Sequence, residues 1–123
     1  MLYRLNDDET VTQVTDPSKC TVGKRILLTH LKGSVTKNTI TVSTVFLGID
    51  HNWSRSGDPI LFETMVFGLD DDKEVCFRSS SIEEIKQIHY RACSDYINNS
   101  YKYISGDTLP GQTLIKDSEI DLF

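Results

Sequence analysis

Two runs of β-branched and aromatic residues constrain the fold of this chain more than any other feature. They cover Thr39 to Ile49 and Ile60 to Phe67, and such side chains pack well on the pleated surface of a strand. The connection between them, Asp50 to Pro59, is polar. A crossover between parallel strands needs about a dozen residues or more, so we expect these strands to pair antiparallel. The connection is also long for a hairpin tip, and long loops between strands are often functional.

Shorter runs on either side extend the predicted sheet. Arg25 to Leu31 has the composition of a strand, and Lys37-Asn38 forms the tip of a hairpin leading into the next strand. Glu74 to Arg78 is a further short strand after a polar turn. Residues 1–22 contain few apolar positions, so we expect an irregular N-terminal segment with one short strand at Val11–Val14.

A single helix is predicted after these strands. Ser81 and Glu84 have the spacing of a capping box, in which each side chain accepts from the backbone N–H of the other residue. Apolar residues follow at steps of three and four, as on one face of a helix: Ile82, Ile85, Ile88, Ala92 and Tyr96. The pattern weakens near Asn98-Asn99, and Gly106 marks the latest end of the helix.

Strands followed by one helix are typical of an α+β fold. We expect an antiparallel β-sheet of about four to five strands with one main C-terminal helix packed on it. The length of 123 residues suits one domain, so residues 1–123 are predicted to fold as a unit. Residues 107–123 are expected to form an extended C-terminal tail.

Net charge, apolar runs and cysteine spacing indicate which partners and which cellular location to expect. The formal net charge of −5 argues against duplex nucleic acid as a partner, because binding to phosphates needs a basic surface. No signal peptide is evident, and no apolar run reaches the roughly 20 residues of a membrane span. Three cysteines without CxxC spacing indicate free thiols rather than disulfides or a zinc site. We expect a cytoplasmic protein that does not bind a membrane.

Asp50 beside His51 is the most suggestive pair for catalysis. In a hydrolase, a loop carboxylate and an imidazole could share a proton or bind a metal. Adjacent residues of an extended chain point in opposite directions, however. His30 and His89 lie in separate predicted elements without ligand spacing. We therefore expect no metal site, and we favour Asp50 as the cap of a turn with His51 hydrogen-bonded in the loop.

Glu63 is unusual because it alternates with apolar residues. On a strict period of two it shares a face with Leu61, Met65 and Phe67, and a carboxylate on an apolar face needs a partner. One interpretation is a buried acceptor for a ligand hydroxyl or amine. The other is a salt bridge or an edge position open to water, and the candidate partners for the salt bridge are Arg25, Arg78 and Lys86.

Aromatic residues and arginines are candidates for contacts with a nucleotide. Those that could stack on a base or hold phosphates are Trp53, Phe77, Tyr90, Tyr101, Tyr103, Arg25, Arg55, Arg78 and Arg91. Scattered aromatic residues more often fill a core or a surface, but nothing local buries Trp53 in its polar loop. The sequence has no Walker loop, GxGxxG, HExxH or nucleophile elbow. We therefore expect a protein that is not an enzyme, with no catalytic residues and no cofactor.

Two neighbouring segments of the chain resemble a known family. VSTVFLGIDHN at residues 42–52, followed by PILFETMVFG at residues 59–68, looks like a family of small phage and prophage proteins. The resemblance extends over about residues 25–90, through Arg78-Ser79-Ser80 to His89. The chain is similar to the phage Thoeris anti-defence sponges. These proteins sequester cyclic ADP-ribose signals, and in some members cyclic oligonucleotides, without cleaving them.

The resemblance implies a homo-oligomer in the cytoplasm of a bacterial host, with pockets for a small nucleotide-derived ligand at subunit interfaces. It assigns no ligand contacts, so the candidate binding residues are chosen for their chemistry: Arg25, Asp50, His51, Trp53, Glu63, Phe77 and Arg78. An aromatic ring would stack on adenine, the two arginines would hold a diphosphate, and a carboxylate would accept from ribose hydroxyls. The loop sequence Trp53-Ser54-Arg55-Ser56 departs from the glycine-rich loops of the relatives.

Two other functions stay open at this point. One is a hydrolase or phosphodiesterase acting on such a messenger through His51, Asp50 and Glu63. The other is an inhibitor that docks on a host defence protein through its acidic surface.

Overall fold

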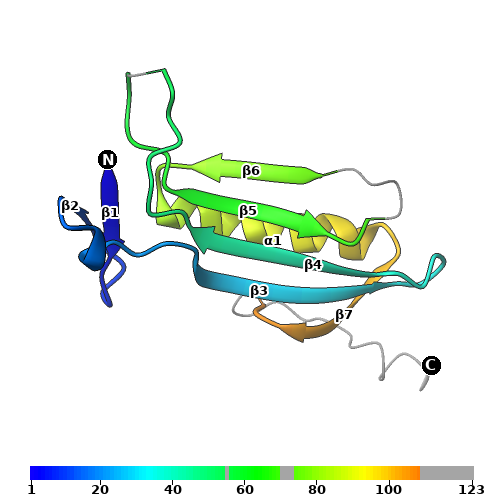
Figure 1. The fold of residues 1–123 in the computed structure, drawn as a ribbon. Helices are drawn as coiled ribbons and strands as arrows, with labels where there is room; N and C mark the ends of the chain where they lie inside the picture. The colour runs from blue at the N-terminus through cyan, green and yellow to red at the C-terminus, as the bar shows by residue number, and fades with distance from the viewer. Residues whose placement is uncertain (55, 70–73, 109–123) are drawn as a thin grey trace.

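Five antiparallel strands and one long helix form the body of the molecule (Figure 1). The computed structural model describes residues 1–54, 56–69 and 74–108. The strand order in the sheet is β6-β5-β4-β3-β7. The strands are β3 (Lys24–Gly33), β4 (Thr39–Phe46), β5 (Phe62–Phe67), β6 (Val75–Ser79) and β7 (Tyr101–Gly106). The predicted α+β fold is therefore confirmed.

Helix α1 (Ile82–Asn98) has Ser81 as its N-cap residue, as the capping pattern predicts. The Ser81 hydroxyl accepts from the Glu84 backbone N–H at 3.2 Å. The reciprocal half of the predicted capping box is wrong, because the Ser81 backbone N–H donates to Ser79 Oγ at 3.0 Å. The Ser81 hydroxyl itself donates to the Glu83 carboxylate. Two carboxylates in the first turn also suit the positive end of the helix dipole.

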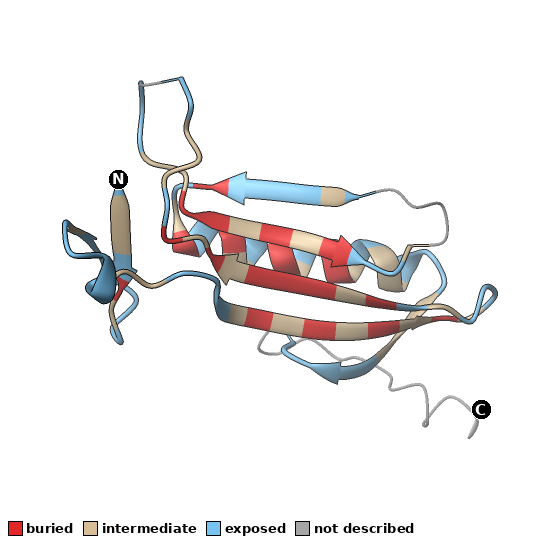
Figure 2. Cartoon of the chain, in the orientation of Figure 1, coloured by how far each residue is buried: buried red, intermediate tan, exposed pale blue. Residues whose placement is uncertain are grey.

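The core lies between α1 and one face of the sheet, which we call the covered face (Figure 2). Alternate residues of the central strands point to this face, and Phe46, Phe62 and Val66 are at most 2% exposed there. Ile85 of α1 is fully buried in one cluster with Phe46 and Phe62. The opposite face, which we call the open face, is not covered by any helix of residues 1–54, 56–69 and 74–108.

A small N-terminal hairpin packs beside one end of the sheet (Figure 1). The predicted strand at residues 11–14 is β2 (Val11–Val14), and it pairs with β1 (Leu2–Leu5), which the sequence analysis did not predict. A short 3-10 helix, η1 (Pro17–Lys19), follows. The Tyr3 N–H donates to the Gly48 carbonyl at 2.8 Å, and Leu5 is buried in the core. The N-terminal segment is therefore anchored to the domain.

The edge strand β7 was also missed by the sequence analysis. It follows directly after α1, with Ser100 at a φ of 76°, and pairs antiparallel with β3. Asp107 secures its far end, because its carboxylate accepts from the Leu28 N–H at 2.8 Å. The predicted tail at 107–123 lies outside the described residues beyond Thr108.

Candidate functional site

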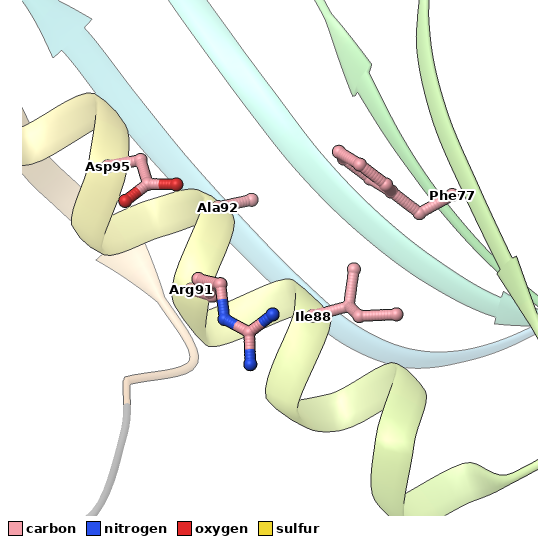
Figure 3. A pocket seen from close by; sticks show the side chains of 5 residues that line it. All are labelled: Phe77, Ile88, Arg91, Ala92 and Asp95. Carbon is pink, nitrogen blue, oxygen red and sulfur yellow. The ribbon is translucent and has the colours of Figure 1, made fainter.

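A groove of about 280 Å³ lies between edge strand β6 and helix α1. Its lining residues are Phe77, Ile88, Arg91, Ala92 and Asp95. Figure 3 shows the Phe77 ring on one wall, facing Ile88 and Ala92 on the other. Arg91 and Asp95 add one cationic and one anionic group, so the groove is apolar inside and charged at its helical rim.

The groove follows from the position of β6 at the edge of the sheet. Phe77 pairs with Thr64 of β5 and therefore points to the covered face. Thr64 is fully buried, whereas Phe77 is 42% exposed because no strand continues the sheet beyond it in the described chain. Ile88 and Ala92 lie one helical turn apart on α1 and form the facing wall. A flat aromatic group would fit between these walls.

The seven predicted binding residues do not form one site. Phe77 lines the groove, whereas Arg78 points to the open face. Arg25 lines a separate hollow of about 170 Å³ beside Asp7 and Glu9 of the N-terminal hairpin. Asp50, His51 and Trp53 lie together in the β4–β5 loop. Sequence reasoning therefore found one residue of the groove, and grouped it with residues of three other regions.

Glu63 and Arg78 form an ion pair on the open face. They are directly opposite each other in the β5–β6 register, and Arg78 Nε lies 2.9 Å from Glu63 Oε2. The Glu63 side chain is 12% exposed and that of Arg78 is 45% exposed. The hydrogen bond that Arg78 donates to the Glu63 carboxylate raises the pKa of Arg78. Of the two interpretations of Glu63, the structure thus has the salt bridge, with Arg78 as the partner. The pair lies on the open face, away from α1.

The β4–β5 loop is held by Asp50. Its carboxylate accepts from the backbone N–H groups of Asn52, at 2.7 Å, and Ile60, at 2.9 Å. These two bonds lower the pKa of Asp50. His51 bonds through Nδ1 to the Ile49 carbonyl at 2.8 Å, so this nitrogen carries a proton. The favoured reading, a capping carboxylate and a loop-bound imidazole, matches this geometry, and Asp50 and His51 share no hydrogen bond among the interactions of the described chain.

Trp53 is the most exposed aromatic side chain of this loop. It is 77% exposed, and its ring centroid lies 5.7 Å from that of His51 with the planes tilted by 52°. The Ser80 hydroxyl donates to the Asp58 carbonyl at 3.4 Å, which ties the loop to the residue after β6. The loop therefore projects at the end of the sheet where β6 ends (Figure 1).

A polar cluster buried between the sheet and α1 was not predicted. His89 is fully buried, and its Nε2 and Nδ1 lie 2.8 Å from the hydroxyls of Thr29 and Thr44 respectively. Thr44 in turn bonds to Thr64 at 2.6 Å. Burial lowers the pKa of His89 to about 4, so the imidazole is neutral at pH 7. The sequence signals were three threonines in three strands and the helical spacing of His89 with Ile85 and Ala92.

The direction of each hydrogen bond in this cluster follows from Thr29. Its hydroxyl donates its single proton to the Asp107 carbonyl at 2.7 Å, so it must accept from His89 Nε2–H. The neutral imidazole then accepts at Nδ1 from Thr44, and Thr44 accepts from Thr64. The cluster is fully satisfied and has no accessible surface, so we interpret it as structural.

No group of three or more potential metal ligands occurs within residues 1–54, 56–69 and 74–108. In the same part of the chain, no helix is long and apolar enough to cross a membrane. Comparison with known proteins gives no match, because no family model fits the chain and no curated protein or solved structure is significantly similar. The chain is thus an α+β domain with a groove between an edge strand and its helix.

Proposed function

We propose that this protein binds and sequesters a nucleotide-derived messenger of the cyclic ADP-ribose type without cleaving it. The observation that carries the proposal is the partly exposed ring of Phe77, which faces the apolar side chains of Ile88 and Ala92 across the groove. Arg91 lies at the rim of the same groove. An aromatic wall next to a guanidinium is a combination that suits a base joined to phosphate.

The size of the groove limits what it holds. Ligand pockets usually range from about 300 to 1,000 Å³, and this groove, at about 280 Å³, is slightly smaller than that range. It therefore suits one base with its ribose, with the phosphates placed outside against Arg91. Asp95 lies one helical turn from Arg91 on the same rim, and its carboxylate would accept hydrogen bonds from ribose hydroxyls.

The resemblance of residues 25–90 to the phage anti-defence sponges supports the same function. On this proposal the protein acts as a homo-oligomer in the host bacterial cytoplasm. Hydrolysis by His51, Asp50 and Glu63 has less support, because Asp50 is engaged by two backbone N–H groups and Glu63 by Arg78. Docking on a host protein has one observation in its favour, the exposed Trp53.

The first test is thermal unfolding of the purified protein with cyclic ADP-ribose isomers and with cyclic di- and trinucleotides. A ligand that binds only the folded state adds about 2.7 kcal/mol at 100-fold over its Kd, which raises the Tm by several degrees. We expect such a shift, with the ligand recovered intact by chromatography. A ligand recovered as product would contradict sequestration, and no shift with any nucleotide would contradict the proposed ligand class.

The groove is tested by two substitutions. Phe77→Ala and Arg91→Ala should each abolish most of the ligand-induced shift in Tm, since one removes the stacking wall and the other the cation. Trp53→Ala, in the projecting loop, is the matched control and should leave the shift unchanged. Loss of the shift in Trp53→Ala alone would place the ligand at the loop instead.

A further inference from the structure

Edge strand β6 is an open pairing edge. In the described part of the chain it pairs with β5 on one side only, and Cys76, Phe77 and Arg78 are all exposed. Unpaired edges bind other strands unless a bulge, a proline or a covering segment blocks them. Residues 74–79 contain no proline, and the β5–β6 register is regular throughout the strand. Within the described residues, neither a proline, a bulge nor a neighbouring strand blocks this edge.

The sequence of β6 is complementary to itself in one antiparallel register. When Cys76 lies opposite its own copy, Glu74 lies opposite Arg78 of the partner subunit and Val75 lies opposite the partner's Phe77. A two-fold axis repeats both pairs. Opposite charges and apolar side chains directly across two strands are stabilising pairs.

Among residues 74–80, the two neighbouring registers that keep the same face outward, centred on Val75 and on Phe77, pair no opposite charges. Centring the pair on Phe77 puts Cys76 opposite Arg78 of the partner subunit and Glu74 opposite Ser80 of the partner subunit. Neither contact matches charge with charge. The register centred on Cys76 is therefore the one that the charges select.

The groove supports the same arrangement. Phe77 points to the covered face and is half-exposed because the sheet stops at β6. In the register centred on Cys76, the partner's Val75 lies beside Phe77 on that face. The partner would thus complete the outer wall of the groove described above, and the two grooves would lie next to each other at the two-fold axis.

We propose that two copies of this chain pair antiparallel through β6, in the register that places Cys76 opposite Cys76 of the partner subunit. The result is one continuous ten-stranded sheet, twice the five strands of one copy, with both helices on the same side. This pairing does not depend on the identity of the ligand.

Cys76 supplies a direct test of the register. Residues directly opposite on antiparallel strands have Cβ atoms about 4.5–5.5 Å apart, which is close to disulfide geometry. Burial and the nearby Glu63 raise the pKa of the Cys76 thiol, so mild oxidation is done at alkaline pH. In a Cys20→Ser background, with Cys93 buried, we expect a covalent dimer on a non-reducing gel. Cys76→Ser should remove it.

Sedimentation equilibrium of the unmodified protein measures the association itself. We expect twice the monomer mass of 14.0 kDa. Glu74→Arg places like charges across the axis twice and should weaken the dimer by about tenfold or more. Asp7→Arg makes the same change of charge in the exposed turn of the N-terminal hairpin and should leave the Kd unchanged.

Two results would overturn the proposal. One is a monomer at the highest soluble concentration. The other is a dimer that neither crosslinks through Cys76 nor responds to Glu74→Arg, since such a dimer uses another face. Far-ultraviolet circular dichroism of each variant separates lost pairing from lost folding.

Discussion

Thr44 donates its hydroxyl proton to His89 Nδ1 across the interface between β4 and α1, with 2.8 Å between the two atoms. Both residues are fully buried in the core and have no solvent-accessible surface. The contact joins the middle of the sheet to the middle of the helix, so the stability of the domain depends on the protonation state of one imidazole.

The first prediction concerns pH. Burial lowers the pKa of His89 to about 4 from its usual 6.5, so as pH falls the unfolded state takes up the proton first. The contribution of neutral His89 is therefore complete above about pH 6.5 and is lost as pH falls toward 4. We expect a loss of about 3 kcal/mol across this window, measured by urea unfolding at a series of pH values.

The matched control for this prediction is His89→Gln, which cannot titrate. It should be less stable than the unsubstituted protein at pH 7, and its stability should fall less steeply between pH 6.5 and 4. Equal slopes for the two proteins would show that other groups cause the pH dependence.

The second prediction ranks two threonines of the same cluster. Thr44→Val removes the donor to His89 and the acceptor of Thr64, and should cost about 1–3 kcal/mol because buried polar atoms lose their partner. Thr64→Val removes only the outer donor of the chain and should cost less. Urea unfolding of both variants at pH 7 gives the order, and the reverse order would contradict the central position of Thr44 between His89 and Thr64.

The third prediction compares two glycines. Gly48 has a φ of +80°, and an added Cβ would lie 1.9 Å from the Thr21 carbonyl oxygen. Gly57 has a φ of +83°, but its nearest neighbour would be Asn52 Nδ2 at 3.7 Å. Gly57→Ala should cost about 1 kcal/mol for backbone strain alone, and Gly48→Ala about 3 kcal/mol or more. Similar unfolding free energies would argue against the close approach of residues 21 and 48.

The fourth prediction concerns the ion pair on the open face. Glu63→Gln should reduce the unfolding free energy by less than about 1 kcal/mol, because Arg78 is nearly half exposed and solvent screens the pair. It should also leave the ligand-induced shift in Tm unchanged, since Glu63 is on the opposite face from the groove. Loss of that shift would support the other interpretation of Glu63, as an acceptor for a ligand hydroxyl or amine.

The sequence alone predicted the elements whose signals are local. The strands around Thr44 and Thr64 were recognised because their β-branched composition suits strands, and α1 because Ser81 caps a helical pattern. The antiparallel order followed from short connections. In each case the interactions that decide the structure lie between neighbours in the chain, so a single sequence contains them.

The tertiary structure decided everything that depends on which face a residue occupies and on pairs far apart in sequence. Strand β7 was missed because it is stabilised by pairing with β3 rather than by a strong local pattern. His89 lies 45 residues from Thr44 and 60 from Thr29, and no spacing rule connects them. Glu63 shares its face with Met65 as alternation requires, but only the position of α1 shows that this face is open. The helix packs on the face of the sheet where the larger apolar surface is buried. That surface is formed by residues from all the strands together, so no single segment determines it.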